Sequence, residues 1–286
     1  MELIQELWSG YGELNRVYLD DSSVILKLIK TKTGQGHPRG WNSSLSHKRK
    51  ELSYKIERKW YQDYNSPIDN APLPKLIDAG EVGNSQYLIL EDLKERGFQV
   101  KPSLSWEEVK SCISWLAHFH SHHLNSTPKG LWAIGTYWHL GTRPEELSAL
   151  KDQSLNEAAP LIDKKLNQAK HKTLVHGDAK LANFLFNDSG AAAVDFQYVG
   201  GGVGVKDLAY FLSSIYREDE LFEKEAECLD FYFKELNACI EVESEWRELY
   251  PYAWCDFYRF LKGWSPGHYK LNSYSEQMTE KVLKWL

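Results

Sequence analysis

The sequence predicts an α+β protein in which a small β-rich part precedes a larger, mostly helical part. Short apolar runs bounded by turn residues, which are typical of strands, fill much of the first 93 of the 286 residues. Apolar residues at helical spacing dominate from residue 94 onward. The change of pattern near residues 92–97 therefore predicts two lobes, residues 1–93 and residues 94–286.

The first part is expected to contain a hairpin, a loop, a helix and two more strands, in that order. Apolar runs on both sides of an Asp/Ser turn predict the hairpin strands at residues 17–19 and 24–29. The polar stretch from residue 31 to about 46, which includes residues 37–41 (HPRGW), is expected to be a loop. The pattern then predicts a helix at residues 46–64 and strands at residues 75–79 and 86–91.

The second part is expected to consist of helices separated by short strands. Helical spacing predicts helices at residues 106–123, 145–170, 206–216, 218–237, 245–261 and 274–285. Short apolar runs predict strands at residues 173–175, 184–186 and 192–194.

Net charge, cysteine spacing and the distribution of apolar residues argue against several classes of protein. The formal net charge of −6 argues against a general nucleic-acid binder, which normally carries a basic excess. None of the four cysteines has the spacing of a metal-ligand motif, so all four are expected to be reduced core thiols. The N-terminus lacks an apolar signal core, and no apolar run approaches the roughly 20 residues that cross a bilayer. We therefore expect a soluble, cytoplasmic protein without a nucleic-acid or membrane partner.

Two neighbouring segments contain the candidate catalytic and metal-binding residues. Residues 174–183 (LVHGDAKLAN) follow the pattern H-x-D-x-x-x-x-N, and residues 194–197 (VDFQ) come shortly after them. An apolar run leads into each segment. This arrangement is typical of a kinase catalytic loop followed by a metal-binding motif of the DFG type.

The residue types match the demands of phosphoryl transfer. The reaction needs a carboxylate that orients the attacking hydroxyl and accepts its proton, and Asp178 fits that role. Mg²⁺ prefers hard oxygen ligands and takes few from the protein, and Asn183 and Asp195 supply an amide and a carboxylate oxygen. Lys180 has two interpretations, a catalytic lysine that reaches the transferred phosphate or a surface lysine on the loop.

These segments resemble the aminoglycoside phosphotransferase and choline kinase superfamily, and most closely its ecdysteroid-kinase-like branch. Residues 53–57 (SYKIE), 90–93 (LEDL) and 205–211 (VKDLAYF) share the resemblance, which spans roughly residues 10–212. It implies a protein-kinase-like fold with a small β-rich N-terminal lobe and a larger helical C-terminal lobe. It also implies an ATP- and Mg²⁺-dependent phosphotransferase that transfers the γ-phosphate to a hydroxyl of a small molecule.

Two rival functions stay open, a nucleotide-binding pseudokinase or regulatory module and a protein kinase. The intact set Asp178, Asn183 and Asp195 argues against the first. The short interval between Asp195 and the next predicted helix, which lacks the A-P-E signature of a peptide-docking segment, argues against the second.

The resemblance also implies a lysine on the third strand, paired with a glutamate on the following helix. Lys27 resembles that lysine, because it alternates with Ile25 and Ile29 and so shares their inward face; Lys30 is the alternative. Glu57 is the first candidate partner and Glu51 the second.

Three further features take their interpretation from the resemblance. Gly10 and Gly12 resemble part of a phosphate-covering turn, although the third glycine of the G-x-G-x-x-G pattern is missing. Glu91, Asp92 and Leu93 fall at the lobe boundary, where the fold binds adenine through its backbone. Asp207 is expected to brace the catalytic loop from the next helix.

The sequence leaves the acceptor open among aminoglycosides, choline-like amines, sugars and sterol-like alcohols. A group of C-terminal residues forms either a cage for a cationic ligand or part of the core: Trp254, Asp256, Tyr258, Trp264 and Tyr269. The glycines at residues 200–204 either allow close approach of the substrate or form a tight turn.

Overall fold

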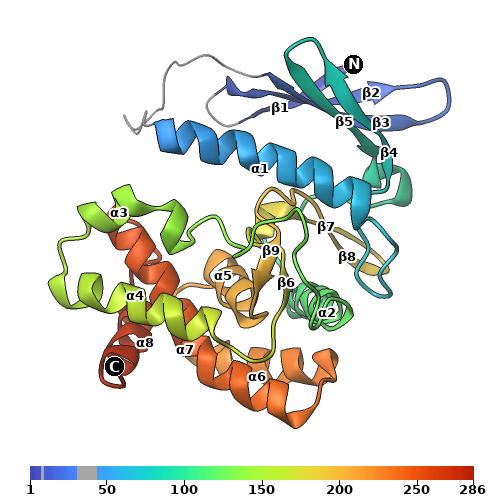
Figure 1. Cartoon of the computed structure of the whole chain (residues 1–286). Coiled ribbons are helices and arrows are strands. Elements are labelled where there is room, and N and C mark those ends of the chain that lie inside the picture. The colour runs from blue at the N-terminus through green and yellow to red at the C-terminus, as the bar shows by residue number, and fades with distance from the viewer. Residues whose placement is uncertain (8–9, 31–43) are drawn as a thin grey trace.

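The structure, a computed structural model, describes residues 1–7, 10–30 and 44–286. It shows an N-terminal sheet with one long helix against it and a larger helical part beyond that helix (Figure 1). The predicted α+β class and the order of its two parts are therefore confirmed. Most of the loop predicted from residue 31, including residues 37–41, lies outside the described residues.

The sheet is antiparallel and five-stranded, in the order β1-β2-β3-β5-β4. Its strands are β1 Glu2–Glu6, β2 Gly12–Tyr18, β3 Ser23–Lys30, β4 Leu76–Val82 and β5 Ser85–Glu91. Strand β1 was not predicted. All five of its residues are exposed, so it lacks the alternation of buried and exposed residues from which a strand is inferred.

Helix α1 (Ser44–Asp63) joins the sheet to the helical part. Tyr54, Ile56 and Trp60 on this helix are buried. The Trp60 ring stacks on Phe196 of the helical part with the ring centroids 4.8 Å apart. Such pairs contribute about 0.5–1.5 kcal/mol beyond the apolar area that they bury, so α1 is held firmly against the segment that carries Asp195.

The helical part contains α-helices of 6 to 25 residues as well as short strands and 3-10 turns. They are η2 Leu93–Arg96, α2 Trp106–His122, η3 Leu140–Thr142, α3 Pro144–Ala149, α4 Gln153–Asn167, β6 Thr173–Val175, η4 Leu181–Asn183, β7 Phe184–Asn187, β8 Gly190–Ala193, β9 Gly200–Gly202, α5 Val205–Ile215, α6 Glu218–Leu236, α7 Ile240–Trp264 and α8 Ser273–Leu283. Strand β6 pairs with β9, and β7 pairs with β8, both antiparallel.

Two predicted helices differ from the structure. The helix expected at residues 145–170 is divided into α3 and α4, because Asp152 begins α4 as its N-cap and accepts the N–H of Leu155 at 3.1 Å. Helix α7 begins at Ile240, before the predicted residue 245.

The glycines at residues 200–204 form strand β9 and the start of α5. A Cβ on Gly200 would lie 2.3 Å from the carbonyl oxygen of Trp132, and one on Gly201 would lie 2.8 Å from that of Ala133. The strand is buried against these backbones. Close backbone packing, not approach of a substrate, therefore requires the glycines.

Within the described ranges, no helix has both the length and the apolar character needed to cross a membrane.

Candidate active site

A cavity of about 850 Å³ lies between the sheet, helix α1 and the helical part. The predicted catalytic, metal and nucleotide residues that line it are Lys27, Glu57, Glu91, Asp92, Leu93, Asp178, Lys180, Asn183 and Asp195. Gly10 and Gly12 are not among the lining residues, although Tyr11 between them is. The fold thus gathers the strand lysine, the helix glutamate and the catalytic-loop residues around one space.

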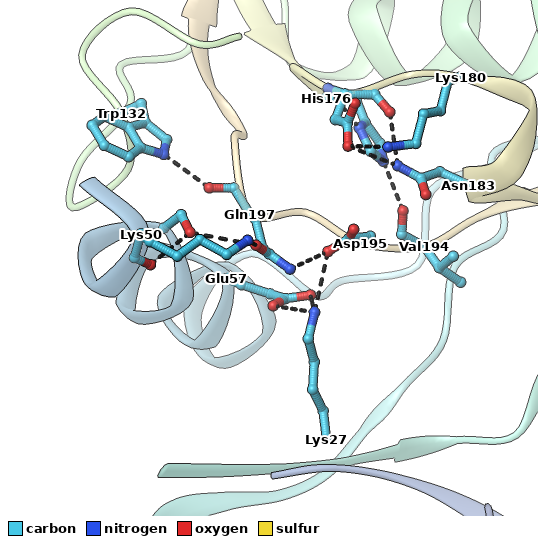
Figure 2. A network of polar contacts seen from close by, with 12 residues as sticks. Lys27, Lys50, Glu57, Trp132, His176, Lys180, Asn183, Val194, Asp195 and Gln197 are labelled. Carbon is cyan, nitrogen blue, oxygen red and sulfur yellow. Dashed lines mark hydrogen bonds and ion pairs between the residues drawn. The ribbon is translucent and has the colours of Figure 1, made fainter. Parts of the chain in front are cut away.

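Lys27 of β3 connects the two parts of the molecule at this cavity (Figure 2). It is only 5% exposed, and its Nζ donates to both carboxylate oxygens of Glu57 at 2.7 and 2.9 Å. It also donates to Oδ1 of Asp195 at 3.1 Å. Burial opposes the charged form of Lys27, but the two carboxylates outweigh burial and raise its pKa.

Lys30 and Glu51, the alternatives to Lys27 and Glu57, do not line the cavity. Lys30 is exposed and pairs with Glu13 at 3.1 Å, and Glu51 contacts His47 at 3.2 Å. The structure therefore places Lys27 and Glu57 at the cavity centre and gives the other two residues surface partners.

Asp195 is held in an uncommon backbone conformation. Its φ is +69°, which is in the left-handed region that non-glycine residues rarely adopt. The adjoining Phe196 is fully buried, stacked on Trp60 and 4.6 Å from the His176 ring. This packing fixes the direction of the carboxylate, and such strained residues are concentrated at functional sites.

The carboxylate of Asp195 remains ionised despite its burial. Burial raises its pKa, but the cationic groups of Lys27, Lys50 and Lys180 outweigh burial and hold the pKa well below its usual range. Gln197 Nε2 donates to Asp195 Oδ1 at 2.6 Å, and Lys50 Nζ donates to Gln197 Oε1 at 2.7 Å (Figure 2). The sequence did not identify Lys50 and Gln197 as site residues; the glutamine in place of the usual DFG glycine was the available signal.

The catalytic loop has a tight backbone braced from α5. Gly177 has a φ of +81°, and a Cβ there would lie 2.1 Å from the carbonyl oxygen of Tyr198, so only glycine fits. The two carboxylate oxygens of Asp207 accept the N–H groups of His176 at 2.5 Å and Gly177 at 2.9 Å. Asp207 thus braces the loop, as the sequence led us to expect.

Removing the charge of Asp207 is expected to destabilise the protein. An Asp207→Asn variant has one acceptor oxygen for two buried N–H donors, and hydrogen bonds to charged groups contribute about 1.5–3 kcal/mol each. We expect the free energy of unfolding, measured by urea denaturation, to fall by about 2–4 kcal/mol. The exposed acid Asp230, which pairs with Arg247 on the surface, provides the control, and Asp230→Asn should change stability by less than about 0.5 kcal/mol. Equal stability of the two variants would contradict the bracing role.

Asp178 has one carboxylate oxygen in use and one without a well-formed hydrogen bond. Oδ2 accepts from Lys180 Nζ at 2.9 Å and lies 3.3 Å from Asn183 Nδ2. Oδ1 is buried and accepts no hydrogen bond of normal geometry among the described residues, although the nearby Tyr210 side chain interacts with this carboxylate. A buried acceptor of this kind is costly unless something donates to it. Because Asp178 lines the cavity, a hydroxyl group bound there can satisfy it.

The oxygen atoms available at the cavity suit a magnesium ion. Asn183 donates through Nδ2 to the backbone carbonyl of Asp178 at 2.8 Å, which leaves its Oδ1 as a neutral ligand. In Asp195, Oδ1 accepts the bonds from Lys27 and Gln197, and Oδ2 is the second carboxylate oxygen. One carboxylate and one amide oxygen fit the preference of Mg²⁺ for a few hard protein ligands.

At the lobe boundary, the Asp92 side chain binds residues of the sheet and of η2. The Asp92 carboxylate accepts from Arg16 Nε at 2.5 Å and from Ser23 Oγ at 2.7 Å, and it caps η2 through the N–H of Lys94. It holds the sheet to the boundary, so the Asp92 carboxylate is already occupied by donors of the chain itself.

The glycines of the first turn serve the sheet itself. Gly12 has a φ of +147°, and a Cβ there would lie 1.9 Å from the carbonyl oxygen of Leu28 on β3. Only glycine at position 12 therefore allows β2 to pair closely with β3. Covering of phosphates by this turn stays a prediction, and Trp8 and Ser9 fall outside the described residues.

The C-terminal aromatic group is mostly core. Trp254, Asp256 and Tyr258 are at most 3% exposed, and the Asp256 carboxylate is bound by Arg259 at 2.6 Å. Trp264 lines the cavity, whereas Tyr269 lies at a smaller neighbouring pocket. Of the two alternatives, the core interpretation therefore holds for Trp254, Asp256 and Tyr258, and the five residues do not form one cage.

The comparison with known proteins agrees with this geometry. The profile of the ecdysteroid kinase-like family matches residues 56–126 and 133–243. No functionally curated protein matches the sequence.

Three solved structures share the fold over almost the whole chain. A thermostable aminoglycoside phosphotransferase mutant, in a ternary complex with ADP and hygromycin B, has a TM-score of 0.56 at 11% identity, covering 99% of this chain and 93% of that one. An amicoumacin kinase in complex with AMP-PNP, Ca²⁺ and Ami has a TM-score of 0.55 at 14% identity, covering 98% and 86%. The choline kinase LicA from Streptococcus pneumoniae has a TM-score of 0.51 at 13% identity, covering 100% and 95%. The predicted two-lobed, kinase-like architecture is confirmed.

Proposed function

This chain belongs to the ecdysteroid kinase-like family, and from that premise we propose that it is an ATP- and Mg²⁺-dependent kinase of a small hydroxylated molecule. The observation that carries the proposal is the meeting of Lys27, Glu57 and Asp195 beside the unsatisfied carboxylate oxygen of Asp178. Residues far apart in the chain thereby form the constellation that phosphoryl transfer requires. Kinases of aminoglycosides, amicoumacin and choline share the fold, which supports a small-molecule acceptor.

In the proposed site, residues 1–93 form the nucleotide-binding lobe and residues 94–286 the catalytic and acceptor-binding lobe. Lys27, oriented by Glu57, holds the α- and β-phosphates, and the backbone of residues 91–93 holds adenine beside the cavity. The turn containing Gly10 and Gly12 covers the phosphates. The complexes of the similar structures with ADP and AMP-PNP support the proposal that this chain binds a nucleotide.

Asn183 and Asp195 would hold the magnesium ion, which supplies positive charge against the β- and γ-phosphate oxygens when bound. Asp178 accepts the proton of the acceptor hydroxyl at its open oxygen, Oδ1. The hydroxyl oxygen forms a bond to the γ-phosphorus as the bond to the β–γ bridging oxygen breaks, and ADP leaves. Lys180, 2.9 Å from Asp178, lies where it can contact the transferred phosphoryl group.

The rival functions have less support in the site. A pseudokinase would not require an intact Asp178, Asn183 and Asp195, and all three line the cavity here. A protein kinase needs a platform for a peptide, whereas the segment after Asp195 enters the buried strand β9 and then α5. We also propose the cytoplasm as the location, on the support of four cysteines without a disulfide.

A label-transfer assay tests the proposed function. The protein is incubated with ATP labelled on the γ-phosphate, Mg²⁺ and a panel of neutral, acidic and basic alcohols. We expect label in an organic phosphate with Mg²⁺ present and none with EDTA. Label that appears only in inorganic phosphate, or in a protein substrate, would contradict the proposal.

A further inference from the structure

The half of the cavity beyond Asp178 has an aromatic wall. Its members come from α5, α7 and the segment before α3: Tyr137, Tyr210, Phe257, Phe260 and Trp264. Tyr137 contacts Tyr210 and Phe260 with ring centroids 5.4 Å apart in each pair. We call these five residues the aromatic wall. Its breadth favours an acceptor with a large apolar surface.

A buried lysine is set into this wall. Lys270 is 9% exposed, and its Nζ lies 4.8 Å from the Tyr210 ring centroid and 5.5 Å from that of Phe257. Its hydrogen bond goes to the neutral hydroxyl of Ser213, at 3.2 Å. In the described part of the chain, no carboxylate forms an ion pair with it, although it lines the cavity. The negative charge of Asp178 acts on Lys270, but that carboxylate already pairs with Lys180, so an anion that reaches Lys270 is stabilised by a buried cation with no ion pair of its own.

The opposite flank of the aromatic wall is also positive. Arg143 lies 5.1 Å from the Phe260 ring centroid and pairs with Glu146 at 3.0 Å. Arg49 donates to neutral acceptors, the Thr142 carbonyl at 2.7 Å and Ser46 Oγ at 3.2 Å. Burial first, and the positive charge of Arg143 second, lower the pKa of Arg49. Two guanidinium groups thus lie near each other at the cavity, and the Glu146 carboxylate pairs with that of Arg143.

The acids that line the cavity are already neutralised. They are Glu57, Glu91, Asp92, Asp178 and Asp195, and each pairs with a lysine or arginine of the chain. A cationic acceptor could therefore form an ion pair in this cavity only by competing with these lysines and arginines or by contacting the catalytic Asp178. It would instead meet Lys270 and Arg49 at close range, which is repulsive in a poorly solvated space.

We propose that the acceptor is a hydroxylated organic acid with an apolar body, whose acid group is bound by Lys270 while its hydroxyl faces Asp178. This inference rests on the proposed function and adds the charge class of the substrate to it. The aromatic wall packs against the apolar body, and a charge-assisted hydrogen bond from Lys270 Nζ fixes the acid group. Lys270 is then a specificity-determining residue, and aminoglycosides and choline-like amines are excluded as acceptors.

Three matched probes test the charge class without depending on turnover. They share a naphthalene skeleton with a hydroxymethyl group on one ring and, on the other, a carboxylate, a second hydroxymethyl group or an aminomethyl group. Binding to the full-length protein is measured by calorimetry without nucleotide. We expect the acid to bind at least about tenfold more tightly than the diol, and the amine to bind most weakly. Equal affinities, or tightest binding of the amine, would overturn the proposal.

Variants of Lys270 separate a role in binding from a role in packing. Lys270→Gln should lower affinity for the acid by about tenfold and leave affinity for the diol within about twofold. Lys262→Gln is the matched control, because Lys262 pairs with Asp152 outside the cavity. A loss for both probes in Lys270→Gln would mean a structural role only and would overturn the assignment.

The pH profile provides a readout that packing alone does not change. Burial lowers the pKa of Lys270 to about 8. The charged or titratable groups nearest to it are Asp178 and Lys180 of the catalytic loop, Tyr210 of α5, and His268 two residues before it. Lys270 also lines the smaller neighbouring pocket, together with Tyr216, Arg217, Glu218 and Tyr269. Affinity for the acid should be constant well below pH 8 and fall as the pH rises through about 8, because the neutral amine loses its attraction for the carboxylate. Lys270→Arg should restore binding and remove this fall; a flat wild-type profile would contradict the proposal.

The outcomes distinguish this inference from the proposed function. Binding of the acid without label transfer to any alcohol of the panel would support an acid-binding pocket at Lys270 and contradict the kinase function. Transfer to the amine in preference to the acid would support the kinase function and overturn the acceptor class. If Lys270→Gln weakened ATP binding but not acid binding, Lys270 would serve the nucleotide phosphates, and the proposal would fall.

Discussion

The Asp178→Asn variant is expected to lose turnover by about 10²- to 10⁴-fold while binding ATP with near-normal affinity. Asparagine matches the shape of the aspartate, so the contact with Lys180 survives in part and the catalytic loop remains braced by Asp207. What disappears is the charged oxygen that faces the cavity without a well-formed hydrogen bond and accepts the hydroxyl proton. Steady-state turnover and ATP affinity from calorimetry, measured on the same preparation, check the two halves of this expectation.

Asp188 supplies the control for Asp178, because it is an exposed acid in the turn that follows β7. Asp188→Asn should leave both turnover and ATP affinity unchanged. Turnover of Asp178→Asn within about tenfold of the wild type would contradict the catalytic-loop assignment.

The Asp195→Asn variant is expected to lose both turnover and the magnesium-dependent part of ATP affinity. Asp195 is the single carboxylate in the proposed metal site, and Asn183 offers only a neutral oxygen beside it. Without the carboxylate, the two amide oxygens bind Mg²⁺ weakly, so turnover should fall below detection. Titration of ATP with and without Mg²⁺ measures the effect, and wild-type affinity in the presence of Mg²⁺ would contradict the metal assignment.

The catalytic half of the site could be predicted because its residues lie in short, regular segments. The spacing of Asp178, Asn183 and Asp195 predicts one meeting point, and the alternation of Lys27 with Ile25 and Ile29 predicts the inward face of β3. The resemblance then identifies Glu57 as the partner of Lys27, and the structure places their side chains 2.7 Å apart. Local periodicity and short loops carry this information in the sequence itself.

The elements that escaped prediction lack such local signals. Strand β1 is exposed on both faces, and β9 consists of three glycines, so neither shows an apolar run. The division of the helix predicted at residues 145–170 depends on the single N-cap at Asp152. Local pattern does not distinguish these cases, because tertiary packing decides them.

The acceptor side depends on contacts between distant segments. Lys270 meets Tyr210 and Phe257 only through the packing of its segment on α5 and α7, and nothing in its neighbouring sequence indicates a cavity. Likewise, no role was predicted for the Asp92 carboxylate, which Arg16 and Ser23 of the sheet occupy. Side-chain pairing across the fold therefore had to come from the structure.

Thermal unfolding with ATP and Mg²⁺, compared with Mg²⁺ alone, tests the central claim most directly. A ligand that binds only the folded state raises the unfolding midpoint by mass action, by about 2.7 kcal/mol in free energy at a hundred times its Kd. We predict a clear rise with millimolar ATP and Mg²⁺, a smaller rise with ATP and EDTA, and no magnesium-dependent rise in Asp195→Asn. An unchanged midpoint for the wild type at millimolar ATP and Mg²⁺ would contradict a nucleotide site formed by Lys27, Asn183 and Asp195.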